Sequence, residues 1–348
     1  MNYFKGAALA WLLLITSLSL PARATVFKIA SIAPEGSQLM REMRSSADEI
    51  KKLTAGRVTI KYYGGGVMGN DRKVLQKIRS GQLQGGALAA SGVGDPYPDI
   101  NLYGLPLLFR SQNEVDFLRG KLDKELLKGL DEAGFISFGF ADGGFALLMG
   151  GKPASRIDDL RGQKAWAPEA DQLSYLAMES MQLSPVVLPI AAVLTGLQTG
   201  QLDIVATPPV GALWLQWYTK VKYVTDLPLV YTMGLMVVDK REYAKISAVD
   251  QAIFRKVMEA TYQRLDRMGR KANARAKLAL RANGLHFVKP EAAAVSVWQK
   301  KMAASNRRIW RDGNYTPDLL PRALALLDEY RLKPTPSRET SRPGDAAQ

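Results

Sequence analysis

The stretch that decides the fold is SAVDQAIFRKVMEATYQRLDRMGRKANARAKLALRANG, residues 247–284. Its apolar residues recur at the three- to four-residue spacing of a helix with one buried face. Ser247 is a suitable N-cap with Asp250 three residues on, and Gly284 is typical of a position just past a helix end. A helix of about 35 residues is about 50 Å long. That is longer than one small lobe, so we expect the helix to lie across two lobes.

Strand and helix patterns alternate on the N-terminal side of this stretch. Expected strands are 26–32, 58–63, 83–90, 163–167, 185–188 and 204–206, and expected helices follow at 39–55, 70–80, 171–181 and 190–199. Parallel strands need such helical crossovers, so the order predicts an α/β fold with a mostly parallel sheet. The pattern occurs twice, which indicates two lobes of about 120 residues each. In such folds a ligand lies at the carboxyl ends of the strands, here in the cleft between the lobes.

The N-terminus has the layout of a secretory signal peptide. Lys5 supplies the positive region, 7–20 is apolar, and Ala22-Arg23-Ala24 offers small residues for cleavage before Thr25. The apolar run is short for a membrane span. We therefore expect a periplasmic protein, exported through the inner membrane and cleaved near Ala24. The expected organisation is a signal peptide at 1–24, lobe I at 25–142 plus about 230–268, lobe II at 143–229 plus about 269–332, and a disordered tail at 333–348.

The composition limits which kinds of functional site the chain can form. The chain has no cysteine and one histidine, His286, which excludes thiolate metal sites and leaves little for a catalytic triad. No Gly-x-Ser-x-Gly elbow or phosphate-binding glycine loop occurs. We expect no cofactor, no metal and no enzymatic activity, with a secreted hydrolase as the least favoured alternative. The net charge of +14 is spread along helix faces rather than gathered in a stripe, so we expect no nucleic-acid partner.

Several motifs, in order, resemble the solute-binding receptors of tripartite ATP-independent periplasmic (TRAP) transporters, of the dicarboxylate-receptor type. The motifs are VMGNDR (67–72), LPLLF (105–109), IDDLRGQK (157–164) and LQTGQLD (197–203) ahead of Thr207-Pro208. The resemblance covers about Val26 to Tyr330 and includes the long helix, which in that family spans both domains. It implies the two-lobed periplasmic binding protein fold. It also implies a small-molecule ligand and delivery to TRAP membrane permease subunits.

The chain departs from the family at the ligand. Trp166, between Gly162-Gln163-Lys164 and Pro168, stands where the family has an arginine that pairs with a carboxylate. The other positions that the resemblance places at the ligand are Ala90, Phe145, Ala146, Thr207 and Leu229, with Trp214 as further aromatic surface. A carboxylate taken into a cleft without a cation loses hydration that nothing replaces. We therefore expect an apolar or aromatic ligand, with Trp166 as a wall of the cleft. Alternatives left open are a receptor that works with a helical periplasmic accessory subunit, or with a sensor.

Overall fold

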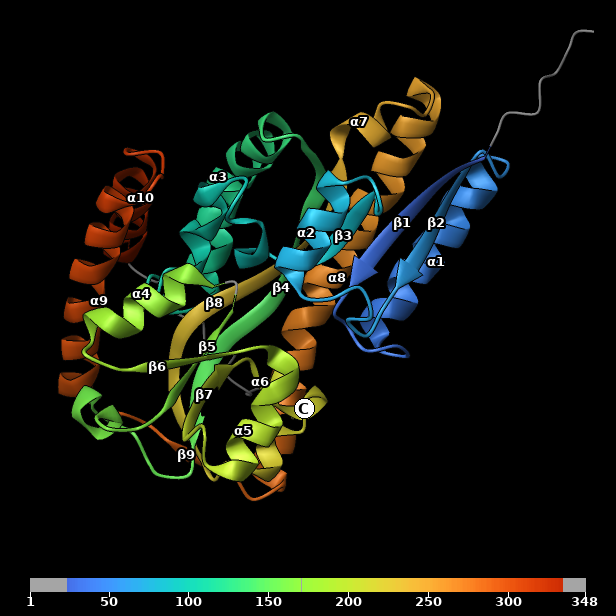
Figure 1. The fold of residues 1–348 in the computed structure, drawn as a ribbon. Helices are drawn as coiled ribbons and strands as arrows, with labels where there is room; N and C mark the ends of the chain where they lie inside the picture. Colours follow the sequence, from blue (N-terminus) through green and yellow to red (C-terminus); the bar gives the residue numbers. More distant parts are fainter. Residues whose placement is uncertain (1–23, 170, 334–348) are drawn as a thin grey trace, which may run out of the picture.

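The computed structural model describes residues 24–169 and 171–333, so the expected signal peptide and tail lie almost entirely outside the described residues. Its centre is one mixed sheet in the order β2-β1-β3-β8-β4-β7-β5-β6, with β9 beside β8 (Figure 1). The strands are β1 (Thr25–Ser31), β2 (Val58–Tyr63), β3 (Gly85–Ala89), β4 (Phe135–Gly150), β5 (Ala165–Pro168), β6 (Pro185–Leu188), β7 (Ile204–Thr207), β8 (Tyr223–Asp239) and β9 (His286–Val288).

Two long antiparallel strands, β4 and β8, pass through both halves of the molecule. In lobe I, β8 pairs with β3, which continues to β1 and β2. In lobe II, β4 pairs with β7, which continues to β5 and β6. The expected α/β fold with two lobes is therefore confirmed. The pairing of β4 with β8 shifts register three times, and each irregularity bends the strands as they pass from one lobe to the other.

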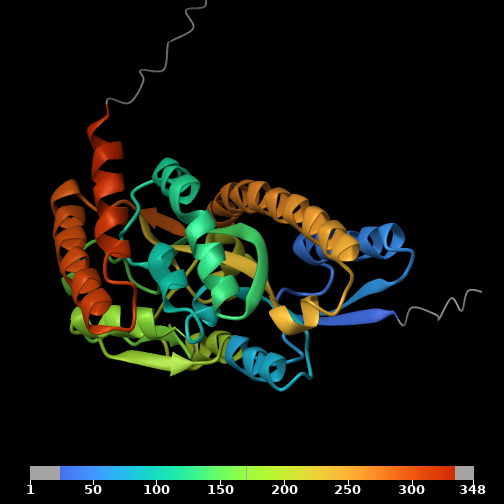
Figure 2. The same cartoon turned by 90° about the horizontal axis from the view of Figure 1, so that it is seen from above.

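Helices cover both faces of the sheet. They are α1 (Gln38–Leu53), α2 (Asp71–Arg79), α3 (Gln112–Glu132), α4 (Gln172–Ser180), α5 (Val193–Thr199), α6 (Pro209–Trp214), α7 (Lys240–Tyr243), α8 (Ala248–Ala282), α9 (Ala292–Asp312) and α10 (Leu319–Leu332). Short 3-10 turns are η1 (Ser91–Val93), η2 (Pro98–Gly104), η3 (Ile157–Leu160), η4 (Ile190–Ala192) and η5 (Trp217–Thr219). In Figure 2, α1 and α8 lie on one side of β1 and α2 lies on the other.

The long helix is confirmed. Helix α8 begins after Ser247, whose hydroxyl accepts the Asp250 amide, and ends one residue before Asn283. It contacts α1 in lobe I, β4 at the crossing and α6 in lobe II. Figure 1 shows it running behind the sheet from one lobe to the other. One helix therefore supports the β4–β8 crossing along its length.

The C-terminal helices α9 and α10 pack against helices of both lobes. Helix α9 packs on α4 of lobe II, whereas α10 packs on α3 of lobe I. Their apolar residues Met302, Trp310 and Leu327 are buried in the same core cluster as the buried face of α3. The chain after α8 thus contacts both lobes, and the division of the sequence into lobes stays a prediction. Within residues 24–169 and 171–333, no helix is both long and apolar enough to cross a membrane.

Candidate functional site

The strand registers place the carboxyl ends of the parallel strands of both lobes at one cleft. Strand β3 meets the middle of β8 at the pair Ala89–Gly234, and β1 and β2 run parallel to it. From the other lobe, β7 pairs with the last four residues of β4, and its carboxyl end at Thr207 lies opposite Leu147. Strands β5 and β6 run parallel to β7. The loops after these six strands therefore face one another across the crossing of β4 and β8. This is where an α/β fold places a ligand.

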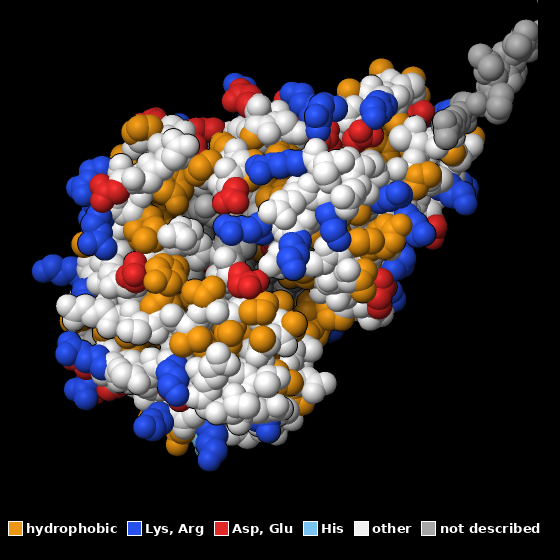
Figure 3. Space-filling model, in the orientation of Figure 1, with side chains coloured by type: hydrophobic (Ala, Val, Ile, Leu, Met, Phe, Trp, Pro, Cys, Tyr) orange, Lys and Arg blue, Asp and Glu red, His pale blue; other side chains and the backbone are white. Residues whose placement is uncertain are grey.

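Two observations show how the lobes meet at this cleft. The side-chain amide of Asn70, which caps α2 in lobe I, donates a 2.8 Å hydrogen bond to Glu169, which follows β5 in lobe II. A cavity of about 560 Å³ lies beside the cleft, between η1 and η2 of lobe I and α4 of lobe II. In Figure 3, hydrophobic side chains border the hollow between the lobes, with charged side chains at its edge.

Four of the residues expected at the ligand lie on or beside the two crossing strands. Phe145 and Ala146 pair with Tyr231 and Val230 of β8, and the half-buried ring of Phe145 lies 5.5 Å from the Tyr231 ring. Ala90 donates its amide to the carbonyl of Met233 on the same strand. The structure therefore brings Ala90, Phe145, Ala146 and Leu229 together at the crossing.

Thr207 reaches the crossing from β7. Its backbone pairs with Leu147, the residue after Ala146. Its side chain lies under the first turn of α6, where a Cβ on Gly211 would be 2.5 Å from the Thr207 hydroxyl oxygen. The glycine therefore leaves room for this hydroxyl, on a residue that is itself buried. Contact of these positions with a ligand stays a prediction.

Trp166 lies in the interior of lobe II. Only 6% of the residue is exposed. Its indole N–H donates to the Leu188 carbonyl at 2.9 Å, and its ring meets the fully buried Trp217 edge to face at 5.0 Å. Its polar atom is satisfied and its ring is packed, so the side chain stabilises the lobe. Its expected role as a cleft wall stays a prediction.

Trp214 differs from the other aromatic residues of this region. It ends α6 and is 46% exposed, whereas Trp217, three residues later, is buried. An indole left this exposed is available for contact with a small molecule or with another protein. Only Trp214 of the two was expected at the ligand from the sequence. The difference in exposure depends on how α6 packs on α8 and β4 and how η5 packs on α5.

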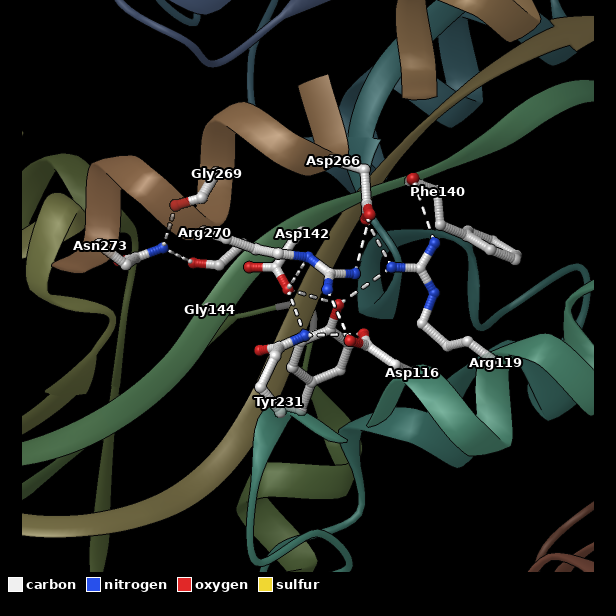
Figure 4. Close-up of polar contacts among 12 residues, drawn as sticks. Asp116, Arg119, Phe140, Asp142, Gly144, Tyr231, Asp266, Gly269, Arg270 and Asn273 are labelled. Carbon is white, nitrogen blue, oxygen red and sulfur yellow. Dashed lines mark hydrogen bonds and ion pairs between the residues drawn. The ribbon is translucent and has the colours of Figure 1, made fainter. Parts of the chain in front are cut away.

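Sequence reasoning missed a polar cluster at the crossing, which Figure 4 shows between α3, β4, β8 and α8. From α8, Arg270 pairs with Asp116 of α3 at 2.7 Å and lies 3.8 Å from Asp142 of β4. From α3, Arg119 pairs with Asp266 of α8 at 2.5 Å. The partners are far apart in sequence, so no local pattern could have found them.

Asp142 is the innermost member of this cluster. Its side chain is 1% exposed, and its Oδ2 accepts from the Tyr231 hydroxyl at 3.1 Å and from Gln112 at 2.9 Å. Its other oxygen, Oδ1, is buried without a partner. Burial raises the pKa of Asp142 above its usual value, against the lowering effect of the Tyr231 hydrogen bond. The cluster also raises the pKa of Tyr231, chiefly through burial. The tyrosine therefore acts as a hydrogen-bond donor to the carboxylate.

A second enclosed carboxyl lies at the cleft edge of lobe I. Asp71, the first residue of α2, accepts the Ala89 amide at 3.2 Å through Oδ2, while its Oδ1 is buried without a partner. Burial raises its pKa to about 6. Gly92 leaves the space for this carboxyl, because a Cβ there would lie 2.4 Å from Oδ2. Asp71 thus holds the end of β3 next to Ala90. Within the described parts of the chain, no group of three or more Asp, Glu or His residues could hold a metal ion.

Two lobes that direct their strand ends into a shared cleft, braced by one long helix, define a two-lobed solute-binding protein. The pattern of the family described as bacterial extracellular solute-binding protein, family 7, matches residues 29–312. The chain belongs to this family, the solute-binding proteins of TRAP transporters. The motif-based resemblance is therefore confirmed.

Individual relatives agree with this assignment. The chain is 22% identical over 265 residues to the sialic acid-binding periplasmic protein of Vibrio cholerae, covering 74% of this chain and 81% of that protein. It is similar to the structure of a sugar acid binding protein from Advenella mimigardefordensis in complex with galactonate, with a TM-score of 0.80, 17% identity and coverage of 88% and 98%. A Bordetella pertussis solute receptor binding pyroglutamic acid gives a TM-score of 0.77, 22% identity and coverage of 88% and 100%. At these identities the structures show the shared fold.

Proposed function

We propose that this protein is the periplasmic receptor of a TRAP transporter, which binds a small organic acid between its lobes and delivers it to the membrane permease. The observation that carries the proposal is the meeting of six strand ends at the β4–β8 crossing, in a chain that belongs to the family. A binding protein needs no reactive groups there. The residues at the crossing, such as Ala90, Phe145 and Ala146, are suited to contact and not to acid–base or nucleophilic chemistry.

The proposed ligand class differs from the apolar or aromatic molecule expected from the sequence. The relatives are named for sialic acid, galactonate and pyroglutamic acid, and each of these molecules carries a carboxylate. This favours an acid for the present chain as well. The apolar border of the cleft and the half-buried Phe145 favour an acid that also has a ring or an aliphatic part.

The carboxylate of such a ligand would be bound mainly by neutral donors. Trp166 replaces the arginine that the family resemblance places at that position, and its own N–H is occupied by Leu188. The Thr207 hydroxyl lies against Gly211 in the first turn of α6, on the residue that pairs with Leu147. A hydroxyl and backbone amides can replace the hydration of a carboxylate when several converge. Neutral donors attract a second negative charge less strongly than an arginine would, so we favour monocarboxylates over dicarboxylates.

Membership of the family supports the proposed periplasmic location and the proposed permease partner. The accessory subunit and the sensor considered from the sequence have no contact surface assigned to them, so the permease is the partner that we propose. A secreted hydrolase is not part of the proposal, because the family and the structural neighbours are binding receptors.

Native mass spectrometry of gently purified protein, followed by extraction of the bound molecule, tests the proposal. We expect a co-purified acid with an apolar part. A thermal-shift series then compares pyroglutamate, galactonate and succinate on the wild type and on Thr207→Val, with Thr199→Val as control, because the Thr199 hydroxyl bonds only within α5. The Thr207 variant should lose response to the bound acid, and the Thr199 variant should keep it. Extraction of a neutral apolar molecule with no response to any acid would refute the acid-binding proposal.

A further inference from the structure

Helix α8 approaches strand β4 very closely at Gly269. A Cβ placed on this glycine would lie 1.9 Å from the carbonyl oxygen of Asp142. No side chain fits in that space, so the helix backbone rests directly on the strand. This point lies where the pairing of β4 with β8 shifts register between Asp142 and Gly144. The helix therefore meets β4 at the place where the strand changes lobe.

Asn273, one turn further along α8, fills the space next to this contact (Figure 4). Its side-chain amide donates to the Gly143 carbonyl on β4 at 2.9 Å and to the Gly269 carbonyl at 3.1 Å. Its Oδ1 accepts the backbone N–H of Val210, in the first turn of α6, at 3.2 Å. Gly144 makes room for it, because a Cβ there would lie 2.4 Å from the Asn273 nitrogen. One side chain thus joins α8, β4 and α6.

The residues that Asn273 contacts on β4 and α6 are close in sequence to candidate ligand positions. Gly143 comes just before Gly144, Phe145 and Ala146, and Val210 comes three residues after Thr207. Three residues earlier, on the same face of the helix, Arg270 holds α3 of lobe I through Asp116. This turn of α8 is therefore attached to lobe I by Arg270 and to lobe II by Asn273.

We propose that Asn273 is a positioning residue that sets the orientation of α6 and lobe II on β4, and through it the width of the ligand cleft. It does not touch the ligand. A hydrogen bond between neutral groups is individually modest, but this side chain satisfies a donor and an acceptor on two separate elements. Without it, α6 keeps its packing on α8 and β4 but loses this hydrogen-bonded link to the crossing. Apolar packing has no direction, so it sets the orientation of α6 less precisely.

The test measures the distance between the lobes and needs no ligand, so its failure is separate from a failure of the proposed function. The chain has no cysteine, so Gln76→Cys on α2 and Gln198→Cys on α5 place one spin label on each lobe, both at exposed positions. Pulsed electron spin resonance gives the distance distribution. In the mature chain without ligand, Asn273→Leu should shift or broaden it. Asn273→Asp keeps the acceptor for Val210 and loses the donor for Gly143, so it should give a smaller change in the same direction.

Asn283→Leu is the matched control, because the Asn283 side chain bonds only to Ala279 within the end of α8. It should keep the wild-type distribution. If the Asn273 variants fold with a lowered melting temperature and an unchanged distribution, Asn273 has only a structural role and the proposal is overturned. If neither Asn273 variant folds while Asn283→Leu does, Asn273 is needed for the fold itself, and the positioning role is likewise rejected.

Discussion

Trp166 shows what a single residue contributes in its own lobe. Its ring packs on Trp217 and its N–H satisfies the Leu188 carbonyl. We expect Trp166→Ala to lower the free energy of unfolding by about 3–5 kcal/mol. Trp166→Phe keeps most of the ring and leaves the carbonyl without its donor, which should cost about 1–2 kcal/mol. Urea unfolding monitors both.

The matched control for this prediction is Trp214→Ala, because Trp214 is 46% exposed. It should change the free energy of unfolding by less than about 1 kcal/mol. Equal losses for the two alanine variants would contradict the interior placement of Trp166. If Trp166→Ala instead keeps its stability and loses ligand affinity, Trp166 is a cleft wall, as expected from the sequence.

Asp71 predicts a pH dependence of stability. Burial raises its pKa from 3.8 to about 6 in the folded protein, so the folded state binds this proton more tightly than the unfolded state. The contribution of Asp71 to the free energy of unfolding is therefore highest at low pH and falls as pH rises through this window. Asp71→Asn keeps an acceptor for the Ala89 amide and removes the charge. The free energy of unfolding of this variant, relative to wild type, should be higher at pH 7.5 than at pH 4.5 by up to about 2 kcal/mol.

Urea unfolding at the two pH values measures this difference. Asp48→Asn, on an exposed position of α1, controls for the general effect of removing one negative charge from a basic chain. A pH-independent effect of Asp71→Asn would mean that the carboxyl is solvated in the folded protein.

At the scale of elements, the contact of α8 with β4 decides the outcome of a glycine substitution. Alanine favours a helix interior over glycine by about 1 kcal/mol. At Gly269 the added Cβ would lie 1.9 Å from the Asp142 carbonyl oxygen, and this overlap outweighs the propensity. We expect Gly269→Ala to destabilise the protein by about 2 kcal/mol or more. Chemical denaturation gives the value.

Gly120 on α3 offers the comparison. A Cβ there meets no atom within 4 Å, so Gly120→Ala should stabilise the protein by about 0.5–1 kcal/mol. Opposite signs for the two substitutions are the expected result. The same sign for both would show that α8 does not rest on β4 as closely as described.

For the whole molecule, the crossing strands and α8 allow the lobes to close by a hinge bend. The ligand extracted from the purified protein should lower the radius of gyration measured by small-angle scattering. Asn70→Ala removes the contact with Glu169 across the cleft and should weaken affinity by about two- to tenfold. An unchanged scattering profile at saturation would count against closure.

How much could be predicted from the sequence depends on the range of the interactions involved. The cap at Ser247 and the strand at Val58–Tyr63 came out as expected, because caps and periodicity are set by neighbouring residues. The order of the motifs was enough to identify the family. The two crossing strands and the helices after residue 290 were harder to place, because their partners are distant along the chain.

The sequence by itself determined the α/β alternation, the long helix and the family, since each follows from local spacing. Only the tertiary structure decided that Trp166 turns into lobe II while Trp214 faces outward. It also decided that Arg270, which looks like one more basic residue on a helix face, meets Asp142 at the crossing. The physical reason is that burial and charge pairing depend on which elements pack together. A side chain's neighbours in space are set by the whole fold, and its neighbours in sequence do not reveal them.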